Sequence, residues 1–245
     1  MNRNDEKLSL LLFYRWKRSY KFYSILFLLY LLGCSPLLYI GNHTMVRYET
    51  FYDSKGCQMI FYIVLTMIIC YSIGSLLELQ RKSNAFARYM LLPKARTKFI
   101  LSEVIVTISM ILLLLSLQAA IYYVGFRNYV SYATFYDVTN GWYLAIARNA
   151  FMSHFLPLTL TQLCILFMSV VTLSTLSVYL GIFFHKRTTL GIMAVSILVF
   201  LYVWQYPVGL SFSLMRGFQL CLMILVFIGC IFCFRYQLKH NEFRG

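Results

Sequence analysis

Long apolar runs separated by short polar stretches dominate the sequence. A helix needs about 20 residues to cross the hydrocarbon core of a bilayer, and its backbone hydrogen bonds are satisfied internally there. Six runs are near that length, so the pattern predicts an all-α integral membrane protein with six transmembrane helices. The predicted spans are Phe22 to Tyr39, Met59 to Leu77, Ile100 to Gly125, Leu156 to Phe184, Leu190 to Trp204 and Phe218 to Phe234.

The residues before the first predicted span combine leucines with basic and aromatic side chains. This mixture, from Glu6 to Arg18, is typical of a helix that lies in the cytoplasmic interface of the membrane. A flexible basic tail is the alternative, because the charges gather at the end of the segment. We therefore expect a single transmembrane domain over residues 1–245, with an interfacial segment (1–21), a six-span bundle (22–234) and a cytoplasmic tail (235–245).

Composition and charge placement agree with this architecture. The chain is 60% hydrophobic and 12% charged, whereas about a quarter of the residues in a soluble domain are charged. Of the 22 lysines and arginines, 17 fall in alternate segments that include both chain ends, and 5 fall on the other side. The positive-inside rule then places both termini in the cytoplasm of a multi-pass cell-membrane protein. Anionic lipid head groups, rather than nucleic acid, explain the net charge of +14.

The sequence lacks the motifs of ATP-binding and metal-dependent enzymes. No P-loop motif is present, so if ATP drives the protein, another subunit binds the ATP. His43, His154, His185 and His240 lie in predicted loops or at span ends, which leaves no metal site. We expect no enzyme activity and no cofactor bound by this chain.

Small side chains in the spans are interpreted as packing residues. Ser72 and Ser75 flank Gly74 in the second span without a histidine to act as their base, so they are expected to let helices approach closely. Cys230 and Cys233 form a C-x-x-C without a second ligand pair, and they indicate neither a redox nor a zinc site. Whether Cys34 pairs with Cys57 near the outer face stays open.

Glu103 is the acid just inside the third predicted span. An ionisable residue at that depth is a functional candidate. Pairing with a basic neighbour such as Lys98 or Arg96 is the favoured interpretation, and a coupling or proton-relay role is the alternative. The chain offers few other titratable groups in its spans, so we expect an external energy source.

Two outward connections carry weaker patterns. The stretch from Phe126 to His154 is rich in tyrosine and tryptophan and is expected at the outer interface as an aromatic belt. The stretch from Gln205 to Gly217 has an apolar middle and follows a short fifth span, so we expect a re-entrant segment between spans five and six.

The polar island from Glu78 to Phe99 separates the second and third spans. After Arg81 and Lys82, Ser83 or Asn84 is positioned to cap a short helix whose apolar residues recur at helical spacing. Proline is expected to end that helix, and the basic run after it leads back to the membrane. An amphipathic loop that clings to lipid is the alternative. The helix is expected to present Phe86, Tyr89 and Met90 and to end at Pro93.

Here the chain resembles the type-2 permease subunits of ATP-binding-cassette (ABC) exporters. The resemblance rests on six spans with both ends inside, the interfacial segment, the re-entrant segment, and Leu92, Pro93 and Arg96, which are similar to the family's leucine-proline-x-x-arginine pattern. It implies a coupling helix that docks in a groove of an ATPase subunit, with Glu78 and Glu103 as ion-paired hinges. The implied contact residues are Ser83, Asn84, Phe86, Arg88, Tyr89, Met90, Leu91, Leu92, Pro93, Lys94 and Arg96.

The function expected from this resemblance is half of the translocation pathway of an ATP-driven exporter. Its partners would be ABC ATPase subunits, a second permease copy or homologue, and membrane lipid. Apolar, aromatic-rich spans suit a hydrophobic or amphipathic substrate, and an antimicrobial peptide or a drug is the first candidate. A chain without a sizeable extracellular domain is less suited to bulky sterols. The alternative is a non-transporting membrane sensor or assembly subunit.

Overall fold

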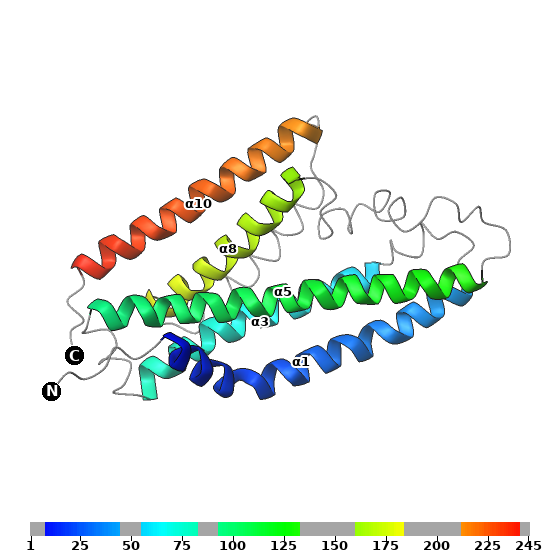
Figure 1. Ribbon diagram of the computed structural model, residues 1–245, viewed down its shortest axis with the longest axis horizontal. Coiled ribbons are helices and arrows are strands. Elements are labelled where there is room, and N and C mark those ends of the chain that lie inside the picture. The colour runs from blue at the N-terminus through cyan, green and yellow to red at the C-terminus, as the bar shows by residue number, and fades with distance from the viewer. Residues whose placement is uncertain (1–7, 45–54, 83–92, 133–159, 184–211, 241–245) are drawn as a thin grey trace.

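The computed structural model describes residues 8–44, 55–82, 93–132, 160–183 and 212–240, and each of these ranges is one helix. The helices are α1 (Leu8–Thr44), α3 (Lys55–Lys82), α5 (Pro93–Tyr132), α8 (Leu160–Phe183) and α10 (Phe212–His240). They form an elongated bundle in which α1 and α3 lie beside α5, while α8 links this group to α10 (Figure 1). The expectation of an all-helical protein is confirmed for the described residues.

Two stretches within these helices are long and apolar enough to cross a membrane. They are Met59–Gln80 in α3 and Arg96–Ile121 in α5. Shorter apolar helical stretches occur at Leu166–Ile182 in α8 and Ile224–Cys233 in α10. The second and third predicted spans thus coincide with the two candidates, while the first, fourth and sixth stay predictions. The predicted fifth span (190–204) lies outside the described residues.

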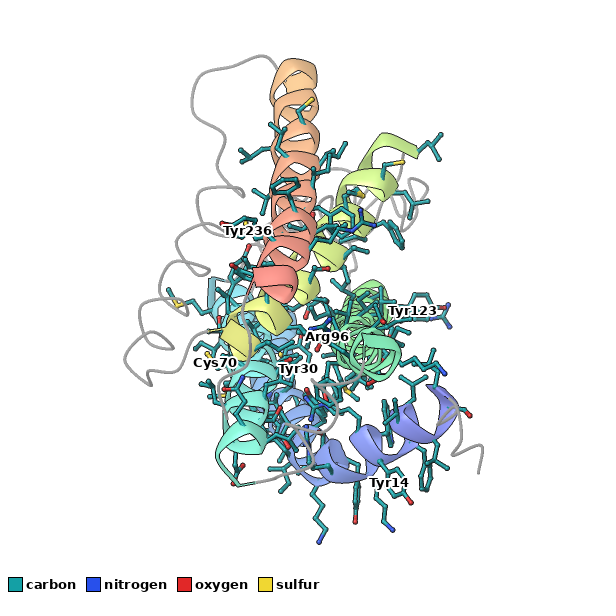
Figure 2. All side chains as sticks on the ribbon, turned by 90° about the vertical axis from the view of Figure 1, so that its left-hand side faces the viewer. Tyr14, Tyr30, Cys70, Arg96, Tyr123 and Tyr236 are labelled. Atoms are coloured by element: carbon teal, nitrogen blue, oxygen red, sulfur yellow. The ribbon has the colours of Figure 1, made fainter. Side chains whose placement is uncertain are left out.

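α1 is one continuous helix, although the sequence suggested an interfacial segment separate from the first span. Residues 8–21, called here the N-terminal segment, join the predicted span without a break in helical structure. The helix nevertheless changes direction: its first turns, which carry Tyr14, run across the long axis of the bundle, and the rest of α1 runs along it (Figures 1 and 2). The N-terminal segment is therefore helical and forms the bent start of α1, while its place in the membrane interface and the first span stay predictions.

Three other boundaries differ from the sequence expectation. The basic run after Pro93, expected as a connection back to the membrane, forms the first turns of α5. Proline is well suited to this position because the first residue of a helix needs no backbone N–H donor. Residues 212–217, the end of the expected re-entrant segment, are helical and begin α10. Residues 126–132 of the expected outer aromatic connection belong to the end of α5.

The apolar core lies between α1, α3 and α5 and extends to α8. It is built from side chains on one stripe of each helix, such as Tyr30 of α1, Ile68 of α3 and Leu114 of α5, all with no exposed surface. α8 approaches α3 closely at Gly181, where an added Cβ would lie 2.8 Å from Leu76 Cδ1 and 3.3 Å from the Cα of Ile73. Glycine permits this approach because it has no side chain.

The outer surface of the bundle is largely apolar. Large hydrophobic side chains such as Leu28 of α1, Phe167 of α8 and Phe232 of α10 are more than half exposed. Among the side chains of α10 that the structure describes, Cys230 is the buried one. A surface of this kind suits lipid rather than water, because soluble proteins rarely expose contiguous apolar patches of such extent.

Candidate functional site

A group of charged and hydroxyl side chains is buried where the first turns of α1 meet α3 and α5. We call it the buried charge cluster. Arg15, Ser19, Ser72, Glu103 and Thr107 are each at most 4% exposed. A charge in such a place is costly unless it is paired and hydrogen-bonded, so the contacts within the cluster decide whether it is stable. The cluster consists of Arg15, Arg18, Ser19, Ser72, Ser75, Glu103 and Thr107.

Periodicity along α1 explains how Arg15 becomes buried. The buried positions near the start of α1 are Leu11, Arg15, Ser19 and Tyr23, four residues apart. Residues at this spacing share one face of a helix. The face that packs against the bundle therefore carries an arginine one turn before a serine.

The guanidinium of Arg15 is bound on three sides. Its Nε contacts Glu103 Oε2 in a salt bridge between α1 and α5. Nη1 donates to Ser19 Oγ at 2.6 Å, and Nη2 donates to Ser75 Oγ of α3 at 2.9 Å. The fixed fork of arginine donors allows one side chain to connect three helical positions at once. Arg15 thus contacts Glu103, Ser19 and Ser75 at the same time.

Hydroxyl groups continue the network from α3 to α5. Thr107 donates to the backbone carbonyl of Glu103 at 2.9 Å, which uses its proton. Its oxygen lies 3.0 Å from Ser72 Oγ, so Ser72 is the donor in that contact. Ser75 donates in turn to the carbonyl of Ser72 at 2.9 Å. Hydrogen bonds and one buried salt bridge therefore join α1, α3 and α5.

Arg18 is a second cation on the same carboxylate. Its Nη2 lies 3.5 Å from Glu103 Oε1, and its side chain is 35% exposed. Burial lowers the pKa of Arg18, and the charge of Arg15 acts in the same direction, while Glu103 and Glu78 oppose them. Arginine stays protonated at physiological pH all the same. Two guanidinium groups against one carboxylate give Arg15, Arg18 and Glu103 a net charge of +1.

Aromatic rings pack beside the cluster on its apolar side. Phe22 of α1 stacks on Tyr71 of α3 with 3.9 Å between ring centroids, and Tyr23 meets the same ring edge-on at 5.2 Å. Ser19 precedes Phe22 and Tyr23 by about one turn of α1, and Ser72 follows Tyr71 in α3, so these rings lie next to the cluster along both helices. Low polarity around the pair strengthens the attraction between its charges.

The two acids named as hinges from the sequence lie in different surroundings. Glu103 is 1% exposed and paired, as the sequence indicated that it should be. The sequence interpretation looked for the partner one turn away at Lys98 or Arg96, and it missed the two arginines of α1. Glu78 is exposed near the end of α3. Ser72 and Ser75, interpreted as packing residues, are hydrogen-bond donors or acceptors between helices.

Most of the predicted ATPase contact region lies outside the described residues. Within α5, Pro93 and Lys94 are its first two residues, and Arg96 is half-buried. α3 ends and α5 begins at the same end of the bundle (Figure 1). Cys57, the proposed partner of Cys34, has its side chain outside the described set as well. The contact residues outside the described ranges are Ser83, Asn84, Phe86, Arg88, Tyr89, Met90, Leu91 and Leu92.

A second contact ties α3 to the end of α8. Gln80 Nε2 donates to the backbone carbonyls of Gly181 at 3.1 Å and Ile182 at 2.7 Å. The last carbonyls of a helix lack partners within the helix, so the amide of Gln80 satisfies them. α8 is thereby fixed to the same end of α3 that leads into the predicted contact region.

Comparisons of the chain with protein families, with curated proteins and with solved structures gave no match.

Proposed function

We propose that the protein is a multi-pass subunit of the cell membrane that forms half of the pathway of an ATP-driven ABC exporter. Its substrate would be hydrophobic or amphipathic, such as a peptide or a drug. ATP and Mg²⁺ would bind a separate ATPase subunit. Two helices of membrane-spanning length and the exposed apolar surface of the bundle support the placement in a membrane.

Helix directions support the proposed topology of six spans with both termini inside. The start of α1, the end of α3, the start of α5 and the ends of α8 and α10 lie at one end of the bundle (Figure 1). α8 ends at this end of the bundle, whereas α10 begins away from it. The proposed fifth span between α8 and α10 would account for these two directions.

The observation that carries the proposal is the position of the buried charge cluster. Arg15 and Glu103 connect α1 to α5, and Ser75 connects both to α3. All three lie within ten residues of the start of α1, the start of α5 or the end of α3. Glu103 lies ten residues after Pro93, about 15 Å along the helix. A force applied to a coupling helix in that region would therefore act on three helices held together rather than on one loop.

The cluster would also let α1, α3 and α5 move together as one rigid unit. Buried ions held by several hydrogen bonds define one register between helices more strictly than apolar contacts do. An ATPase that pulls on the connection between α3 and α5 would shift α1 with them. The second half of the pathway would come from another copy of the chain or a homologue, because the bundle alone encloses little.

Copurification of the chain from its native membranes tests the proposal. An ATPase with a P-loop should copurify with the wild type and hydrolyse ATP in the purified complex. Phe86→Asp or Met90→Asp should remove it, because a charge on the apolar face of the coupling helix prevents docking. Leu225→Asn, on the exposed surface of α10, is the control and should retain it.

Three outcomes would contradict the proposal. One is a wild-type chain that copurifies with no ATPase although it is intact and monodisperse in detergent. Another is equal recovery of the ATPase with both aspartate variants. The third is a stable complex whose other members lack a P-loop, which would favour a sensor or assembly subunit.

A further inference from the structure

The N-terminal segment of α1 has an outward face that the bundle does not cover. Leu10, Phe13, Tyr14, Trp16 and Tyr20 are each at least 45% exposed, and Phe13 reaches 61%. Figure 2 shows Tyr14 on the side of α1 that faces away from the other helices. The opposite face carries Arg15 and Ser19 of the buried charge cluster, so the cluster determines which residues point outward.

Charge on this surface has one sign. Lys17 and Lys21 are exposed among the aromatic residues, and Arg18 is partly exposed beside them. No acidic residue occurs between Leu8 and Thr44 in the sequence. Glu103, which faces Arg18 from α5, is already paired with Arg15. An anionic partner is therefore the chemical complement of the surface.

The direction of the segment selects the kind of anionic partner. The segment runs across the long axis of the bundle, and a helix that crosses membrane spans in this way lies parallel to the bilayer surface (Figures 1 and 2). Tyrosine and tryptophan favour the depth of the lipid head groups, and lysines beside them reach the phosphates. An extended anionic surface with an apolar layer beneath it matches these side chains better than a single small anion does.

We propose that this face, formed by Leu10, Phe13, Tyr14, Trp16, Lys17, Tyr20 and Lys21, is a docking surface that selects anionic phospholipid in the inner leaflet. The proposal rests on the membrane placement given under the proposed function, and it is independent of any ATPase. Lys17 and Lys21 provide the selection by charge. The aromatic rings provide binding that does not depend on lipid charge.

Fluorescence of Trp16 reports on the lipid that contacts this face. The chain has three tryptophans, so Trp142→Phe and Trp204→Phe leave Trp16 as the single emitter. The full-length variant is reconstituted into phosphatidylcholine vesicles that contain equal mole fractions of either brominated phosphatidylglycerol or brominated phosphatidylcholine. Brominated phosphatidylglycerol should quench Trp16 more strongly, because its local concentration at the lysines is raised several-fold.

Lysine substitutions separate selection by charge from contact with lipid. Lys17→Gln with Lys21→Gln should remove the preference for phosphatidylglycerol and keep the quenching by brominated phosphatidylcholine. Arg127→Gln, an exposed basic residue towards the other end of α5, is the matched control and should keep the preference. Added salt should lower the preference in the wild type, since screening weakens exposed charge interactions.

Equal quenching by the two brominated lipids would overturn the proposal, because contact would then occur without selection. Absence of quenching by either lipid would also overturn it, since Trp16 would face protein or water. Far-UV circular dichroism and co-flotation with vesicles establish that each variant is folded and inserted. A wild-type chain that does not co-float would contradict the membrane placement itself, whereas equal quenching contradicts only the lipid docking.

Discussion

α1, α3 and α5 are held together by ions and hydroxyl groups, whereas α10 is held against α8 with most of its apolar surface exposed. In the first group a salt bridge and side-chain hydrogen bonds connect three helices around Arg15. In the second, Leu225 and Phe232 of α10 are 66% and 71% exposed. Polar contacts fix one register, while apolar surfaces in lipid can exchange neighbours at little cost. The comparison suggests a fixed part near the proposed ATPase and an adaptable part beside lipid or a second subunit.

The largest expected effect comes from removing the carboxylate of the buried charge cluster. Glu103→Ala leaves Arg15 buried with its charge unpaired, which should cost about 3–5 kcal/mol. Thermal unfolding in detergent, followed by the loss of monodisperse protein, should begin on the order of 10 °C lower. Arg127→Ala removes an exposed charge from α5 and should change the midpoint little. Similar midpoints for the two variants would mean that the cluster does not stabilise the bundle.

The next largest loss of stability is expected from a substitution that disturbs the close packing of α8 on α3. Gly181→Ala places a Cβ 2.8 Å from Leu76 Cδ1, 3.0 Å from Leu76 Cβ and 3.3 Å from the Cα of Ile73. Overpacking of this kind costs about 1–3 kcal/mol. The same thermal assay should show little change for Gly229→Ala of α10, where an added Cβ meets nothing within 4 Å. A midpoint for Gly181→Ala at or above the wild-type value would argue against the close contact.

A smaller effect is expected from the hydroxyl bridge between α3 and α5. Thr107→Val keeps the shape of the side chain and removes the acceptor for Ser72, at a cost of about 1–2 kcal/mol. Ser116→Ala is the matched control in α5, because that hydroxyl donates to Leu113 of its own helix and is exposed. If both variants melt alike, the bridge contributes nothing specific between the helices.

The smallest effect is expected on the exposed face of α10. Phe232→Ala removes a ring that is 71% exposed, so the stability of the isolated chain should change by at most about 0.5 kcal/mol. The variant should run as the wild type does in size-exclusion chromatography and melt at nearly the same temperature. A large drop in the midpoint would show that α10 packs more tightly than its exposure indicates.

Local patterns were sufficient to predict where the longest apolar helices lie. Met59 to Leu77 falls within α3, and Ile100 to Gly125 falls within α5, because apolar runs bounded by charges specify helices in lipid without reference to distant residues. Boundaries were less predictable. Residues 212–217 form the first turns of α10, although an irregular, re-entrant backbone was expected from Gln205 to Gly217.

The buried charge cluster could be foreseen only in part. Glu103 was marked by its depth in a span, but its partner Arg15 lies 88 positions earlier, and no local pattern encodes such a pairing. One signal was present in the sequence: Arg15 and Ser19 continue the four-residue spacing of Leu11 and Tyr23, so an arginine occupies the buried stripe of α1. A cation on such a stripe requires an acid elsewhere in the bundle.

The central claim is that Arg15 and Glu103 bind each other and so join α1 to α5. A double-mutant cycle with Arg15→Met, Glu103→Leu and their combination, measured as thermal midpoints in detergent, tests it most directly. Glu103→Leu leaves Arg15 buried without a carboxylate, and Arg15→Met leaves Glu103 with Arg18 alone, 3.5 Å away. The double variant removes both of the fully buried charges. The account predicts two unstable single variants and a double variant that recovers most of the lost midpoint. Additive losses in the double variant would contradict it.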